Sequence, residues 1–215
     1  MGRHRCGDAL VATEEWPYFA QPLTDVGSVL RRMHARVSTQ TTYWGIPTMK
    51  NPTDAWIYEE LIWKLRPDVI VEIGNYKGGH LLKMAHQCDL IGVGEVIGVD
   101  IEPVTAAEVV AHERITLVTG EASACYPAVR QLVAGRNTLV IDDSDHGYTN
   151  TLAVLRKYSD LVHPGGYMVI EDTIGIQAQE AVQEFVAEHA CFVIDLSLED
   201  FGVSWNPNGY LRRKC

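Results

Sequence analysis

The sequence predicts an α/β fold: a doubly wound, mostly parallel, Rossmann-like sheet of seven strands with an antiparallel last strand, preceded by an N-terminal helical extension. Three observations lead to this prediction. Short apolar runs rich in Val and Ile recur along the chain, stretches with helical spacing separate them, and a strong turn sequence stands near the end. Strands that alternate with helices in this way form βαβ units, whose strands run parallel.

Six apolar runs are the expected buried strands, because strands covered on both faces read as continuous runs of Val, Ile and Leu. They are Asp68–Ile73, Val96–Ile101, Ile115–Thr119, Thr138–Ile141, Gly166–Ile170 and Cys191–Leu196. The stretches between them predict helices over Gly79–Cys88, Thr105–Ala111, Ala124–Ala134, Tyr148–Leu161 and Gln177–His189.

The C-terminal end departs from this alternation. Phe201–Trp205 and Gly209–Arg213 flank the turn sequence Asn206-Pro-Asn-Gly209. Pro, Asn and Gly in this arrangement predict a terminal hairpin, and a hairpin makes the last strand antiparallel.

The N-terminal part reads as helical. Asp54–Arg66 begins with an acidic residue and stops before Pro67, as a helix does. A weaker helix is expected over Leu23–Val37 and a loop over Thr39–Pro52. We therefore expect a helical extension with an active-site loop in residues 1–53, and one α/β domain in residues 54–215.

Composition excludes several classes of protein. With 47% apolar and 21% charged residues, the chain of 215 residues has globular usage, which excludes disordered, collagen-like and coiled-coil proteins. No apolar run approaches the ~18 residues of a membrane helix, and the Arg-rich start lacks the apolar core of a signal peptide. We therefore expect no membrane span and a cytoplasmic location. A formal net charge of −10 argues against a nucleic-acid partner.

The cysteines are odd in number and widely spaced, with no CxxC pattern. They are Cys6, Cys88, Cys125, Cys191 and Cys215. This distribution favours reduced thiols over a disulfide framework or a zinc site.

A glycine-rich turn, Gly74-Asn-Tyr-Lys-Gly-Gly79, follows the first strand of the predicted sheet. Glycine permits a tight turn and a close approach of the backbone to a ligand, and the next helix offers its amide groups. The spacing is not the dinucleotide fingerprint Gly-x-Gly-x-x-Gly. With Glu72 before the turn and Asp100 ending the next strand, where it can accept hydrogen bonds from ribose hydroxyls, the pattern predicts a nucleoside ligand. The alternative is a purely structural turn.

Two acidic clusters follow neighbouring strands. Asp142-Asp-Ser-Asp-His146 comes after one strand and Glu171-Asp-Thr173 after the next. The carboxyl ends of parallel strands share one edge of the sheet, so the carboxylates would repel one another without a cation. Asp145, Glu171 and Asp172 give an all-oxygen set that suits Mg²⁺, and His146 beside them suits a general base. The alternative is a set of solvated loop acids.

Two other polar residues receive weaker interpretations. Lys50 stands alone in its loop and is expected to be solvated. His80 follows the glycine turn and either reaches the ligand or lies exposed at the start of a helix.

Taken together, these motifs resemble class I S-adenosylmethionine-dependent methyltransferases, and more closely the family named after cephalosporin hydroxylase, which includes rhamnosyl and other sugar O-methyltransferases. The resemblance spans roughly residues 45–213. It is carried by Met49-Lys-Asn-Pro52, Glu72–Gly79, Val99–Glu102, Asp143-Ser-Asp-His146, Pro164–Tyr167, Glu171–Thr173 and Asn206–Arg213. The family's sugar-modifying members act on rhamnosides and on the mannose units of mycobacterial methylated polysaccharides, and in its short length, with almost no insertion between strands, the chain resembles the second group.

The resemblance implies S-adenosylmethionine and Mg²⁺ or Mn²⁺ as cofactors. It implies a set of cofactor contacts, with Ala122 and Ser123 near the adenine: Glu72, Gly74, Asn75, Gly78, Gly79, Asp100, Ala122, Ser123 and Asp143. It matches Asp145, Glu171 and Asp172 to the metal ligands. The chain departs from the family at His80, where a small hydroxyl residue is more usual, at the additional Asp142, and at Glu121-Ala122.

The expected reaction is methyl transfer to a hydroxyl of a carbohydrate or glycosylated small molecule, with His146 as the base and Asp145 beside it. Alternative acceptors are a natural product or a phenol. An NAD(P)-dependent oxidoreductase disagrees with the glycine spacing, and a non-catalytic scaffold that binds S-adenosylmethionine has no need of converging carboxylates. The aromatic N-terminal region suggests a homodimer.

Overall fold

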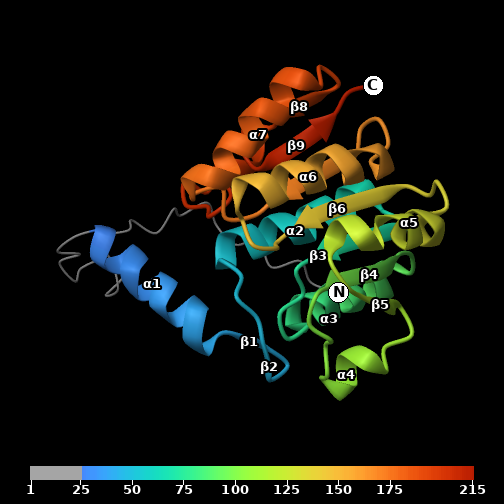
Figure 1. The fold of residues 1–215 in the computed structure, drawn as a ribbon. Coiled ribbons are helices and arrows are strands. Elements are labelled where there is room, and N and C mark those ends of the chain that lie inside the picture. The colour runs from blue at the N-terminus through green and yellow to red at the C-terminus, as the bar shows by residue number, and fades with distance from the viewer. Residues whose placement is uncertain (1–25) are drawn as a thin grey trace, which may run out of the picture.

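The structure, a computed structural model, describes residues 26–215, and its centre is a seven-stranded sheet (Figure 1). The strands are β3 (Val69–Ile73), β4 (Glu95–Asp100), β5 (Ile115–Thr119), β6 (Thr138–Asp142), β7 (Tyr167–Ile170), β8 (Phe192–Ile194) and β9 (Tyr210–Arg213). They lie in the order β5-β4-β3-β6-β7-β9-β8. The first five in this order pair in parallel, and β9 is antiparallel to both β7 and β8. The predicted fold class and its antiparallel last strand are confirmed.

The strand order places a topological switch point between β3 and β6. From β3 the sheet grows through β4 and β5 on one side, and through β6 and β7 on the other. The loops that leave β3 and β6 therefore diverge at the carboxyl edge, which is where open α/β sheets bind their ligands.

Helices cover both faces of the sheet (Figure 1). One face carries α2 (Pro52–Leu65), α3 (Gly79–Ile91) and α4 (Ala107–Val110), and the other carries α5 (Ala122–Val133), α6 (Tyr148–Tyr158) and α7 (Ile176–Glu188). The central strands supply both cores by alternation: in β3, Val71 packs on the second face and Ile70 on the first. Short 3-10 helices, Ser159–Leu161 and Leu196–Glu199, complete the chain. None of the helices described here is long and apolar enough to cross a bilayer.

Two helices begin earlier than predicted because the preceding residues cap them. Asn51 accepts a hydrogen bond from the Thr53 amide, so α2 begins at Pro52. The Glu121 carboxylate accepts from the amides of Ser123 and Ala124, so α5 begins at Ala122.

The N-terminal extension is described from residue 26. The helix expected over Leu23–Val37 begins outside the described residues, and within them α1 (Val26–Gln40) lies beside the sheet (Figure 1). A small antiparallel pair, β1 (Thr42–Tyr43) and β2 (Ile46–Pro47), occupies part of the expected loop. Thr48 follows β2 and meets the glycine turn, where a Cβ at Gly79 would lie 1.8 Å from the Thr48 hydroxyl.

The predicted C-terminal hairpin is wrong in one arm. Residues 201–205 form no strand, because the Asp54 carboxylate binds them: it accepts hydrogen bonds from the Ser204 hydroxyl (2.6 Å) and the Trp205 amide (2.8 Å). The antiparallel neighbour of β9 at the sheet edge is β8 instead.

The expectation of reduced thiols is wrong for two cysteines. Cys191 and Cys215 form a disulfide, because β8 and β9 pair and bring the chain end beside the start of β8, with the two Cα atoms 5.2 Å apart. Their separation in sequence hides this contact. Cys88 and Cys125 are free and buried, and Cys6 lies outside the described residues.

Candidate active site

A cavity of about 850 Å³ opens at the switch point. Its wall is formed by the glycine turn, the ends of β4 and β6, the loop after β2, the loop after β7, and two residues of α1. Of the predicted cofactor residues, most line this wall: Glu72, Gly74, Asn75, Gly79, Asp100, Ala122 and Asp143. Gly78 and Ser123 are not among the lining residues.

The glycine turn is pressed against the acidic loop that follows β6. Gly74 has φ +88°, and a Cβ there would lie 2.0 Å from the backbone carbonyl oxygen of Asp143. Only glycine fits at this distance and in this left-handed conformation. The turn and the acidic loop therefore form one continuous wall.

Asp100 organises the glycine turn. Its Oδ2 accepts hydrogen bonds from the amides of Asn75 (2.5 Å) and Tyr76 (3.1 Å), and its Oδ1 accepts from the Glu102 amide (2.9 Å). The carboxylate is partly exposed and faces the cavity, so it can both fix the turn and accept further hydrogen bonds.

The remaining predicted cofactor residues pack against the protein interior or lie at the start of a helix. A Cβ on Gly78 would lie 2.8 Å from the Val104 side chain, so this glycine packs against the protein interior. Ala122 lines the cavity at the start of α5, and the Ser123 amide donates to the Glu121 carboxylate.

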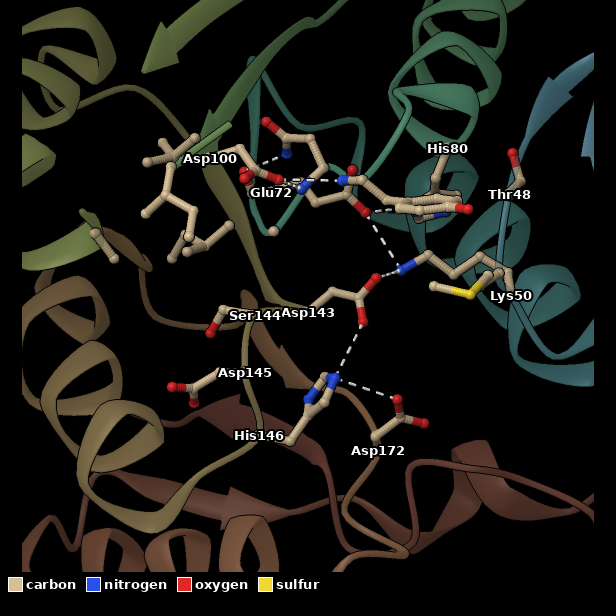
Figure 2. Close-up of a pocket in the computed structure, with 18 of the residues that line it drawn as sticks. Thr48, Lys50, Glu72, His80, Asp100, Asp143, Ser144, Asp145, His146 and Asp172 are labelled. Atoms are coloured by element: carbon tan, nitrogen blue, oxygen red, sulfur yellow. Dashed lines mark hydrogen bonds and ion pairs between the residues drawn. The ribbon is translucent and has the colours of Figure 1, made fainter. Parts of the chain in front are cut away.

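The His146 imidazole lies between two carboxylates (Figure 2). Its Nε2 is 3.2 Å from Asp172 Oδ2 and 3.8 Å from Asp143 Oδ1. His146 and Asp172 both have left-handed backbones, with φ of +56° and +53°. Such conformations cost about 1–3 kcal/mol in non-glycine residues and concentrate at functional sites. This cluster is the part of the cavity best suited to move a proton.

The structure does not bring the three predicted metal ligands together. Asp145 accepts a hydrogen bond from the Gly147 amide (2.8 Å), and its carboxylate points away from the His146 ring (Figure 2). Glu171 lies in the protein interior instead of on the cavity wall. Both residues lie in the turn after β7, where the left-handed backbone at Asp172 separates its side chain on the cavity wall from the buried Glu171. Asp172 instead clusters with Asp143 and His146, with their donor atoms within 4.8 Å of one another.

A buried ammonium group holds the inner carboxylates together. Lys50 Nζ lies 2.6 Å from Asp143 Oδ2 and 3.3 Å from Glu72 Oε1 (Figure 2). It also donates a hydrogen bond to Glu171. Tyr58 donates a second hydrogen bond to Glu171 at 2.7 Å. The expectation that Lys50 is solvated is wrong, because the loop after β2 folds its side chain inward, where it is 5% exposed.

This arrangement shifts the pKa of each member. Burial raises the pKa of Glu171, and the nearby Asp143 carboxylate raises it further. Burial also raises the pKa of Asp143, against the pull of Lys50. Burial alone would lower the pKa of Lys50, but Asp143, Glu171 and Glu72 together hold it well above its usual value.

His80 is buried and belongs to the same network. Its Nδ1 bonds with Glu72 Oε1, while its Nε2 and Glu72 Oε2 have no partner among the described residues. Burial lowers the pKa of His80 to about 4, so the imidazole is neutral near pH 7. Burial would raise the pKa of Glu72, but His80 and Lys50 lower it overall. The exposed alternative for His80 is therefore excluded.

Comparison with known proteins identifies the family of the chain. The sequence profile of the rhamnosyl O-methyltransferase/CmcI family matches residues 35–214. The chain belongs to this family. It is an enzyme, a class I methyltransferase that uses S-adenosylmethionine to methylate oxygen.

Relatives of this methyltransferase agree with the assignment. It is 28% identical over 193 residues to a rhamnosyl O-methyltransferase of Mycobacterium leprae, covering 81% of this chain and 83% of that protein. It is 29% identical over 196 residues to one of Mycobacterium tuberculosis H37Rv, covering 82% and 80%.

Solved structures give the same result. A structure of cmcI with Mg and S-adenosylmethionine has a TM-score of 0.67 and 27% identity, covering 81% of this chain and 77% of that one. An O-methyltransferase of Bacillus cereus, with a TM-score of 0.53, 15% identity and coverage of 82% and 86%, shares the fold.

Sequence reasoning missed the central member of the site, Lys50, and the second bond to Glu171 from Tyr58. Lys50 does lie in the Met-Lys-Asn-Pro motif that carries the family resemblance, and this was the available signal. Tyr58 is one aromatic residue on an otherwise apolar helix face, and nothing in the sequence distinguishes it from a core residue.

Proposed function

We propose that this methyltransferase transfers the methyl group of S-adenosylmethionine to a hydroxyl of a sugar, with a rhamnoside or mannoside as the acceptor class. One observation carries the proposal: a histidine imidazole flanked by two carboxylates on the wall of the same cavity as the glycine turn. The family and the rhamnosyl O-methyltransferases among its relatives support the sugar.

S-adenosylmethionine supplies a methyl group on a positively charged sulfur, which an oxygen nucleophile attacks in line. The residues proposed to hold it are those of the glycine turn and strand ends, with Gly74 allowing close approach. Asp100 would accept hydrogen bonds from the ribose hydroxyls at the end of β4. Ala122 and Glu121, at the start of α5, border the same cavity and would lie near the adenine.

His146 is the proposed base. A hydroxyl placed beside its Nε2 would lose its proton to the imidazole as the oxygen attacks the methyl carbon. Asp172, 3.2 Å from Nε2, would stabilise the imidazolium that forms, and Asp143 would add to this effect. Positioning of the two reactants provides much of the remaining acceleration.

A divalent cation fits the outer carboxylates. Asp143 and Asp172 offer carboxylate oxygens within 4.8 Å of one another, the donor type that Mg²⁺ and Mn²⁺ prefer, and this leaves the His146 imidazole free to take the proton. When bound, the ion would supply positive charge that lowers the pKa of the acceptor hydroxyl. Asp145 and Glu171 remain proposed ligands by resemblance. A metal ion bound to Glu171 would compete with the hydrogen bond that Lys50 donates to this carboxylate.

An acceptor screen tests the proposal. The full chain is incubated with S-adenosylmethionine labelled in its methyl group and with rhamnosides, mannosides, oligosaccharides or catechols, in Mg²⁺ or in EDTA. We expect label in a glycoside only with the metal. Label in catechols alone would overturn the proposal of a sugar acceptor. Unchanged turnover in EDTA would overturn the proposed role of the metal ion. Family membership disfavours the oxidoreductase and scaffold alternatives.

Three expectations stay predictions. They are the homodimer, which light scattering tests, the cytoplasmic location, and the division of the chain at residue 53.

A further inference from the structure

Two aromatic rings from distant parts of the sequence meet on the cavity wall. His34 of α1 and Trp205 of the C-terminal segment have ring centroids 5.0 Å apart, with their planes inclined at 57°. Both residues line the cavity that contains the glycine turn and His146. Neither takes part in the proton transfer or in the proposed cofactor contacts.

Hydrogen bonds of its backbone hold Trp205 in place. Its amide donates to the buried Asp54 carboxylate (2.8 Å), and its carbonyl accepts from the Ile174 amide (3.0 Å). Asp54 is itself fixed by the Tyr210 hydroxyl at 3.0 Å. These backbone hydrogen bonds fix the position of Trp205, and the residue is partly exposed on the cavity wall.

The same contacts fix Trp205 relative to the proposed base. The loop that carries Asp172 lies along the segment that carries Trp205: the Asp172 amide donates to Asn206 Oδ1 (3.0 Å), and the Ile174 bond to Trp205 lies two residues further on. The aromatic pair thus borders the same cavity as His146, and Trp205 lies along the loop that carries Asp172.

The chemistry of this wall suits one face of a sugar ring. Aromatic faces carry partial negative charge, which attracts the weakly positive C–H groups of a pyranose. Met49, 43% exposed, and Ile174, 66% exposed, extend the apolar surface, whereas Asp172 and His146 supply the polar side. A pyranose has the same division, with C–H groups on its faces and hydroxyls around its edge.

We propose that Trp205, with His34, is the platform on which the acceptor sugar stacks, so that a hydroxyl at the ring edge meets His146. This inference rests on the proposed sugar methylation and adds the residues that select a closed pyranose ring. The competing interpretation is that the two rings only attach α1 to the body of the protein.

Kinetics of Trp205→Ala, Trp205→Phe and His34→Ala test the platform, with methyl α-L-rhamnopyranoside and methyl α-D-mannopyranoside as acceptors. We expect Trp205→Ala to raise KM for the glycoside about tenfold or more and to change kcat much less. Trp205→Phe should retain most of the affinity. The KM for S-adenosylmethionine should stay the same in every variant. Trp63→Ala is the matched control, because Trp63 is 63% exposed on α2 and does not line the cavity.

Saturation-transfer NMR gives a second measurement that needs no turnover. With S-adenosylhomocysteine and Mg²⁺ present, ring C–H signals of the glycoside should receive saturation from wild type and lose most of it in Trp205→Ala. The open-chain alditol L-rhamnitol should receive little from either.

Glycoside KM and saturation that remain unchanged in Trp205→Ala and His34→Ala would overturn the platform while leaving sugar methylation intact. A wild-type enzyme that binds S-adenosylmethionine but methylates no glycoside would instead overturn the proposed function.

Discussion

Replacing Lys50 with Met tests the buried charge network directly. The substitution keeps much of the side-chain length but removes the one ammonium shared by Glu72, Asp143 and Glu171. Two of these carboxylates are almost fully buried, and water cannot replace the lost partner. The expected result is a large loss of stability.

The magnitude follows from the distances. At an effective dielectric constant of about 20, charges 2.6 Å and 3.3 Å apart attract by about 6 and 5 kcal/mol. Desolvation of the ammonium, and protonation of a carboxyl group once it is gone, cancel a large share of this attraction. Removing one partner of a buried ion pair typically costs about 3–5 kcal/mol, which we take as the expected value here.

The cost should depend on pH. Burial raises the pKa of Glu171 and of Asp143, so the folded protein holds protons that the unfolded chain has released, and stability falls as pH rises through these folded values. Without Lys50 both pKa values rise further. These carboxyl groups then ionise in folded wild type at pH values at which they stay protonated in the folded variant. Over that range, each group adds about 1.4 kcal/mol per pH unit to the difference in unfolding free energy between wild type and variant. The variant therefore loses more at pH 8.5 than at pH 5.5.

Urea unfolding in EDTA at both pH values measures these quantities. Lys83→Met is the matched control, because Lys83 pairs at 3.0 Å with the partly exposed Glu59, and such surface pairs contribute at most about 1 kcal/mol. A Lys50→Met cost below that of the control at pH 8.5, or a cost that is the same at both pH values, would refute the reasoning.

Three further predictions concern other parts of the fold. Gly74→Ala should lower the free energy of unfolding in urea by at least about 2 kcal/mol, because the new Cβ meets a backbone oxygen. Gly92→Ala, also at positive φ but with open space around it, should cost about 1 kcal/mol, and equal costs for the two variants would contradict the contact. Changing Cys191 and Cys215 together to Ser should lower the free energy of unfolding by about 3 kcal/mol, as expected for a loop of 24 residues. Dithiothreitol should then have no further effect on the variant, and a variant as stable as oxidised wild type would exclude the disulfide. His146→Ala should lower kcat about 10²- to 10⁴-fold with little change in cofactor affinity by calorimetry; a normal kcat would remove it as the base.

The sequence was sufficient to predict the sheet and its edge, because buried parallel strands and the helices between them leave strong periodic signals. That alternation could not place Glu171 and Asp172, because both follow the end of β7 in a turn where Asp172 has a left-handed backbone. Lys50 could not be placed this way, since it comes from an irregular loop whose path depends on Thr48 packing against the glycine turn. The disulfide and the hydrogen bonds from Ser204 and Trp205 to Asp54 are likewise contacts between distant segments, which no local pattern encodes.

The contact between Gly74 and the Asp143 backbone has a consequence for redesign of the enzyme. Because the two loops touch through main-chain atoms, neither can be lengthened or exchanged without moving the other. The wall formed by His34, Ser38 and Trp205 has no such main-chain contact with the glycine turn among the described residues. Libraries aimed at new acceptors should therefore vary that wall and leave the two joined loops untouched.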